Sequence, residues 1–117
     1  MIQEKTFLKL ADNSGAKTVE CIKTYKENKL GSTILTTVKD IKPKSKLKKG
    51  DIYKAIIVRL KKTKVRQNSH IIAFDENAVI LLNAKGDLQG SRLLGPITNE
   101  IRKRNFVKIL SLAPQIL

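Results

Sequence analysis

Residues 51–60 read DIYKAIIVRL, and this stretch predicts the strongest β-strand of the chain. At its centre Ala55, Ile56, Ile57 and Val58 follow one another without a polar residue. Because neighbouring side chains of a strand point to opposite faces, this run is apolar on both of them. Such a strand fits a wall that is covered on both sides, as in a closed barrel that also carries other elements.

Shorter runs rich in Val, Ile and Thr flank this strand, and Gly, Asn, Asp or Pro bound them. This pattern is typical of β-strands. It predicts strands over residues 6–10, 16–22, 33–39, 51–60, 71–74 and 78–82. Between the first two, the sequence Asp12-Asn13-Ser14-Gly15 predicts a turn, because its short polar side chains can bond nearby backbone and Gly15 can take a positive φ.

The last third of the sequence has a different character. Gly86, Gly90 and Gly95-Pro96 indicate irregular structure. After them, Thr98 is a candidate N-cap for a short helix, and Pro114 would end that helix. Phe106 would lie on one stripe of that helix with Ile109 and Leu110. We therefore predict a mainly β fold in one domain over residues 1–117. It consists of a small barrel over about 1–83 and an irregular tail with short C-terminal helices over about 84–117.

Positive charge dominates the composition. Lys and Arg number 24 against 10 Asp and Glu, giving a formal net charge of +14, while 41% of the residues are hydrophobic. A domain this basic repels itself when compact, and a polyanion would relieve that repulsion. Nucleic acid is therefore the expected partner. A membrane is not expected, because no apolar run approaches the roughly 20 residues of a spanning helix.

Two basic segments are the candidate RNA contacts. The first is the lysine-rich loop over residues 42–50, between two predicted strands. Its closely spaced positive charges repel one another, and phosphates that lie among them relieve this repulsion. The second continues out of strand 51–60 and predicts a protruding ribbon that turns near Gln67-Asn68-Ser69. The predicted contacts are Lys42, Lys44, Lys46, Lys48 and Lys49 in the loop, and Arg59, Lys61, Lys62, Lys64 and Arg66 in the ribbon.

Aromatic residues do not form a cluster in the sequence. Proteins that read single-stranded RNA need exposed rings on which bases stack. We expect Phe7, Phe74 and Phe106 to be core residues. The sequence therefore favours recognition of folded RNA through its backbone and shape.

No catalytic or metal-binding constellation is evident, so we expect neither enzymatic activity nor a cofactor or metal. His70 and Cys21 are each the only residue of their kind, which argues against a zinc site. The adjacent carboxylates of Asp75 and Glu76 should point apart, so they do not suit acid–base catalysis. Ser14 has no His partner at a recognisable spacing.

A series of short segments is specific in its order and spacing along the chain. The segments are Met1-Ile2-Gln3-Glu4, Ala11-Asp12-Asn13-Ser14-Gly15-Ala16, Cys21-Ile22-Lys23, Leu47-Lys48-Lys49-Gly50-Asp51, Lys54-Ala55-Ile56-Ile57-Val58-Arg59, Phe74-Asp75, Asn77-Ala78, Leu81-Leu82-Asn83, Gly90-Ser91-Arg92, Gly95-Pro96-Ile97-Thr98 and Lys108-Ile109-Leu110-Ser111-Leu112-Ala113-Pro114. Together they resemble one family, the universal ribosomal protein numbered fourteen of the large subunit, over essentially the whole chain.

This resemblance implies a five-stranded β-barrel with a protruding β-ribbon and short C-terminal helices. It also implies a structural role in the large ribosomal subunit during translation and binding to large-subunit rRNA. The resemblance adds Arg92 to the predicted rRNA contacts. Expected neighbours are the large-subunit proteins numbered three and nineteen, and small-subunit rRNA at intersubunit bridges. A ribosome-silencing factor would dock on the C-terminal region, for which Thr98, Asn99 and Arg102 are the candidates.

The chain departs from the family pattern in three places. Its loop over residues 24–31 is short, its ribbon tip is Asn68-Ser69 in place of Asp-Gly, and Asn99 replaces a common arginine. The Lys- and Ile-rich composition, in a sequence that starts at the family's first residue, favours an organelle-encoded copy in the mitochondrial ribosome, with a plastid or bacterial cytoplasm as alternatives. Other functions left open are a free-standing nucleic-acid-binding barrel, a hydrolase and a membrane-surface adaptor.

Overall fold

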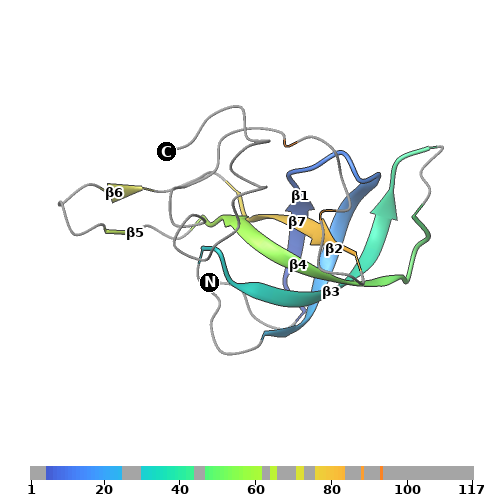
Figure 1. Ribbon diagram of the computed structural model, residues 1–117, viewed down its shortest axis with the longest axis horizontal. Helices are drawn as coiled ribbons and strands as arrows, with labels where there is room; N and C mark the ends of the chain where they lie inside the picture. Colours follow the sequence, from blue (N-terminus) through green and yellow to red (C-terminus); the bar gives the residue numbers. More distant parts are fainter. Residues whose placement is uncertain are drawn as a thin grey trace.

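Five strands close into a barrel in the computed structural model, which describes residues 5–24, 30–43, 47–61, 64–65, 71–72, 76–83, 88 and 93 (Figure 1). They are β1 (Phe7–Leu10), β2 (Ala16–Thr24), β3 (Thr33–Ile41), β4 (Ile52–Arg59) and β7 (Ala78–Leu82). Neighbours pair in the order β1-β2-β3-β4-β7, and β1 pairs with β7 to complete the ring. The predicted mainly β, five-stranded barrel is therefore confirmed.

All pairs in the barrel are antiparallel except the one that closes it. β1 and β7 run parallel, with Lys9 opposite Ala78 and Leu10 opposite Val79. The register shifts twice near the start of β2 and once between Cys21 and Lys23. Such shifts bend a strand and increase its twist, which helps a small sheet to close on itself.

The strands occupy the predicted places with small differences at their ends. β2 and β3 each extend two residues further than predicted, to Thr24 and Ile41. Asp51 and Leu60 lie just outside β4. The predicted ribbon is confirmed as an antiparallel pair of β5 (Lys64–Val65) and β6 (Ile71–Ile72), which lies apart from the barrel strands (Figure 1).

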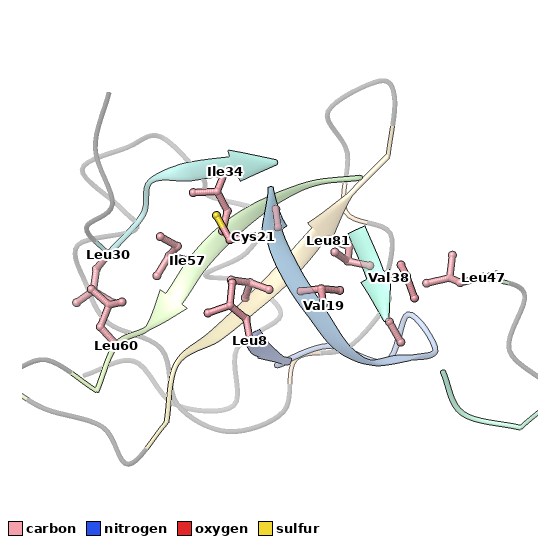
Figure 2. Close-up of a cluster of buried hydrophobic side chains, with 13 residues drawn as sticks. Leu8, Val19, Cys21, Leu30, Ile34, Val38, Leu47, Ile57, Leu60 and Leu81 are labelled. Carbon is pink, nitrogen blue, oxygen red and sulfur yellow. The ribbon is translucent and has the colours of Figure 1, made fainter. Parts of the chain in front are cut away.

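The barrel interior is filled by one apolar cluster, in which Leu8, Val19, Ile34, Ile57 and Leu81 point toward one another from five strands (Figure 2). Each of these five side chains is at most 1% exposed. Two further sets close the barrel at its ends: Leu47 lies beside Val38 at one end, and Leu30 lies beside Leu60 at the other (Figure 2). Burial of each such side chain stabilises the fold by roughly 1.5–3 kcal/mol.

A second cluster covers the outer face of β4 and β7. Ile56, Val58 and Ile80 are fully buried there, and Leu93 and Leu88 pack over them from beyond the last strand. Isolated bridges from Asp12 to Leu93 and from Leu82 to Leu88 hold this cover in place. The prediction that DIYKAIIVRL forms a wall covered on both faces is confirmed. The predicted C-terminal helices lie outside the described residues, and the single domain over 1–117 stays a prediction.

Candidate nucleic-acid interface

The two predicted basic segments lie at opposite ends of the barrel. The loop that holds Lys42, Lys48 and Lys49 joins β3 to β4 at one end, and the chain leaves β4 at the other end toward the ribbon (Figure 1). Lys42, Lys48, Lys49 and Lys61 are all exposed. These four lysines therefore lie at two separate places, one at each end of the barrel.

Asp51 fixes the turn that carries two of these lysines. The Asp51 N–H donates to the Lys48 carbonyl at 3.2 Å, and the Lys48 N–H donates to Asp51 Oδ2 at 3.1 Å. Gly50 lies at the third position of this four-residue turn with φ +90°, as in a type II turn, where glycine is favoured. The two bonds close the turn in both directions, so the backbone that carries Lys48 and Lys49 is held in one geometry.

The same turn is joined to the barrel on both sides. The Gly50 N–H donates to the Val38 carbonyl, and the Val38 N–H donates to the Asp51 carbonyl, each at 2.8 Å. The Tyr53 hydroxyl donates to Asp51 Oδ2 at 3.4 Å. Burial, and then the nearby Asp51 carboxylate, raise the pKa of Tyr53 above its ordinary value, so the phenol keeps the proton that it donates.

Lys42 lies where this end of the barrel meets the first turn. Its N–H donates to the Gly15 carbonyl at 2.8 Å, and Gly15 has the predicted positive φ, at 108°. In that turn Asp12 Oδ1 accepts the Ser14 hydroxyl at 2.7 Å and the Ser14 N–H at 3.3 Å. The predicted turn is confirmed, and the Ser14 hydroxyl is used within it.

At the opposite end, Asn77 and Glu76 organise the exit from β4. Asn77 Oδ1 accepts the Lys61 N–H at 2.8 Å, and the Asn77 carbonyl accepts the Lys9 N–H at 3.2 Å. Glu76 lies 3.1 Å from the Lys9 ammonium and 3.8 Å from the Arg59 guanidinium. Glu76 therefore links β1 to β4 through these two ion pairs.

Arg59 differs from the exposed lysines. Its side chain is only 13% exposed and faces Glu76, so the geometry gives it a place in the barrel wall. Its contact with RNA stays a prediction. The other predicted contacts have no described side chain: Lys44, Lys46, Lys62, Arg66 and Arg92 lie outside the described residues, as do Thr98, Asn99 and Arg102, and Lys64 is described only by its backbone in β5.

One prediction about the aromatic residues is wrong. Phe7 was expected in the core, but it is 62% exposed. It stands next to the buried Leu8 in β1, and the alternation of a strand turns the two side chains to opposite faces. The sequence did contain a signal for this: Phe7 shares its face of the strand with the charged Lys9, whereas the apolar Leu8 and Leu10 share the other face. Phe74 and Phe106 lie outside the described residues.

The described residues contain no group of three or more His, Cys, Asp or Glu that could hold a metal ion. The Cys21 side chain is buried inside the barrel. No helix long and apolar enough to cross a membrane occurs in the described ranges.

Fold and surface together define a class: a small, strongly basic β-barrel whose two ends present exposed lysines on fixed backbone. The family model for ribosomal protein L14p/L23e matches residues 1–117, and the chain belongs to this family. It is therefore a structural, non-enzymatic constituent of the large ribosomal subunit. Its location is the ribosome, where it associates with ribosomal RNA and ribosomal proteins.

The main rival interpretation, a free-standing nucleic-acid-binding barrel, called for exposed aromatic residues. The exposed ring of Phe7 meets that condition, so this feature does not separate the two interpretations. The family match over the whole chain separates them, in favour of the ribosome.

Proposed function

We propose that the protein binds large-subunit rRNA through the lysines at the two ends of its barrel. The observation that carries this proposal is the exposure of Lys42, Lys48, Lys49 and Lys61. None of these four ammonium groups forms an ion pair with a carboxylate of the described residues. Unpaired cations on fixed backbone suit phosphate groups, whose condensed counterions are released on binding.

In this mechanism the lysines neutralise phosphate charges, and the barrel holds the backbone of those lysines in a fixed geometry. The turn of residues 48–51 is closed before RNA arrives, so little backbone entropy is lost when its lysines meet phosphates. Phosphate contacts position a protein on RNA and carry little sequence information. Specificity then depends on whether two RNA segments lie at the spacing that the two ends of the barrel present.

A filter-binding titration with large-subunit rRNA tests the proposal. Affinity should fall steeply as salt rises, by about 10³- to 10⁵-fold between 50 and 200 mM if 6–10 phosphates are contacted. Transfer RNA at equal nucleotide concentration is the control, and it should bind more weakly. Affinity that does not change with salt, or that is equal for both RNAs, would contradict the proposal.

The finer assignments follow from the family. We propose contacts with the large-subunit proteins numbered three and nineteen, and with small-subunit rRNA at intersubunit bridges. Thr98, Asn99 and Arg102 are the proposed contacts for a silencing factor. We propose a mitochondrial ribosome as the location, supported by the Lys- and Ile-rich composition. Chemical cross-linking of purified large subunits, followed by mass spectrometry, would identify the neighbours and the ribosome together.

A further inference from the structure

Phe7 and Ile22 form an exposed apolar patch on the outer face of β1 and β2. Phe7 is 62% exposed and Ile22 is 38% exposed. Glu20 lies directly opposite Phe7 in the sheet. Ile22 follows further along β2, at the point where the register between β2 and β3 shifts, and its side chain is exposed as well.

This patch contrasts with the barrel wall that β4 and β7 form. The outer face of β4 and β7 is covered by Leu88 and Leu93, whereas Phe7 keeps most of its ring in solvent. A single exposed apolar residue needs no explanation. Here an aromatic ring stands with a second exposed apolar side chain in a protein of net charge +14. A partner that covers this patch should therefore combine an apolar face with negative charge.

The charged groups around Phe7 favour a polyanion. Glu20, which lies opposite Phe7 in the sheet, is engaged by a lysine: its carboxylate lies 3.6 Å from the Lys39 ammonium. Glu76, which stands just before β7, lies 3.1 Å from the Lys9 ammonium. Lys9 is on the same face of β1 as Phe7, and its side chain remains 68% exposed. Lys5 is exposed as well, and its N–H donates to the carbonyl of Cys21 in β2 at 2.7 Å.

We propose that Phe7 is a stacking platform for an unpaired base of ribosomal RNA, with Lys5 contacting a phosphate next to that base. A nucleobase has the flat apolar face that an exposed ring accepts, and its backbone supplies the anion that a lysine needs. This inference rests on the proposed rRNA binding and adds to it a contact that is not electrostatic.

Three variants of the full-length chain test the inference in the same filter-binding assay with large-subunit rRNA. Phe7→Leu removes the ring but keeps an apolar side chain, and it should lower affinity about fivefold to a hundredfold. The slope of affinity against salt should not change, because no phosphate contact is lost. Phe7→Tyr keeps the ring and should bind within about twofold of the wild type. Ile22→Ala removes apolar area from the same patch without touching the ring, and should also stay within about threefold.

Fluorescence gives a second measurement. The chain has no tryptophan, so Phe7→Trp introduces a single reporter whose emission should be quenched when a base stacks on it. Thermal unfolding of each variant would check that the barrel is intact, as expected for substitutions at a side chain that is 62% exposed.

The outcomes separate this inference from the proposed function. Wild-type protein that does not prefer rRNA over transfer RNA would overturn the proposed function. Wild-type protein that binds, while Phe7→Leu binds equally well, would overturn only the stacking platform. An equal loss in Ile22→Ala and Phe7→Leu would also overturn it, because the patch would then act as a general apolar surface. Unchanged rRNA binding by Phe7→Leu combined with failed incorporation into subunits would assign the patch to a protein neighbour instead.

Discussion

A single buried carboxylate completes the closure of the barrel. Asp12 is 3% exposed, and its Oδ2 accepts the Leu81 N–H at 3.1 Å. β1 ends at Leu10, and the Ala11 N–H still donates to the Val79 carbonyl at 2.8 Å. The Asp12 side chain therefore adds one more hydrogen bond to the parallel pairing of β1 and β7, beyond the last backbone bond. It also gives the buried Leu81 N–H an acceptor, and without one this donor would destabilise the fold.

The substitution Asp12→Ala should destabilise the fold by about 1–3 kcal/mol, because the Leu81 N–H is left buried without an acceptor. Loss of the bonds to Ser14 also loosens the turn. Urea unfolding would measure the free energy. Asp40→Ala is the matched control, since Asp40 is exposed and accepts only the neighbouring Ile41 N–H among the described bonds; it should cost about 0.5 kcal/mol or less. Equal costs would contradict the role given to Asp12.

Asp12 also predicts a pH dependence. Burial, partly offset by the bonds from Ser14 and Leu81, raises the pKa of Asp12 above its ordinary value of 3.8. The folded state then holds this proton at pH values where the unfolded chain has lost it, so the free energy of unfolding falls as pH rises between the two pKa values. The contribution is fully present below pH 3.8 and is lost as pH passes the raised pKa.

Asp12→Asn does not titrate at this position and isolates the effect. The wild-type free energy of unfolding minus that of the variant should decrease as pH is raised from below 3.8. Urea unfolding at a series of pH values would measure this difference. A difference that stays constant, or one that increases with pH, would contradict the raised pKa.

Gly50 is the residue that permits the lysine turn. A Cβ there would meet no atom within 4 Å, but the φ of +90° is strained for an L side chain. Gly50→Ala should therefore cost about 1–2 kcal/mol through the backbone alone. Gly50→Asn should cost less, because asparagine adopts positive φ more readily. Unfolding and rRNA binding should be measured on both variants, and equal stability of Gly50→Ala and the wild type would contradict the turn assignment.

At the scale of elements, β4 shows how far sequence reasoning reaches. Its apolar run predicted a strand covered on both faces, and both clusters exist. The source of the outer cover was not predictable, because the sequence around Leu88 and Leu93 has no apolar periodicity that would indicate a buried face. The lysine loop was found from charge alone, but Asp51 was not singled out, since a pattern does not show that its carboxylate turns back to the Lys48 N–H.

The two-sided cover of β4 can be tested with three substitutions in one strand. Ile57 faces the barrel interior and Ile56 the outer cluster, and each is 0% exposed. Ile57→Ala and Ile56→Ala should each destabilise the fold by about 2–5 kcal/mol, by lost burial and the cavity left behind. Ile52, which is 61% exposed in the same strand, is the control, and Ile52→Ala should change stability by about 0.5 kcal/mol or less. A small effect at Ile56 would show that the outer cover contributes little.

At the scale of the whole molecule, the barrel separates Lys48 and Lys49 at one end from Lys61 at the other. β4 runs from the lysine turn to the exit toward the ribbon through 8 residues, which at roughly 3.3 Å per residue is about 26 Å. The Debye length at physiological salt is about 8 Å. Charges at the two ends are therefore screened from each other, and each end should bind its own RNA segment.

This separation predicts additive effects on binding. Lys48→Ala and Lys61→Ala should each reduce the slope of log affinity against log salt by about one phosphate contact, and the double variant by about two. The losses in binding free energy should also add within about 0.5 kcal/mol, because the sites are distant and share no partner. Filter binding over a range of salt measures both quantities. Lys39→Ala is the charge-matched control, since Glu20 already engages this ammonium at 3.6 Å, and its slope should change less. If the double variant lost no more than either single one, the two ends would not contact RNA independently.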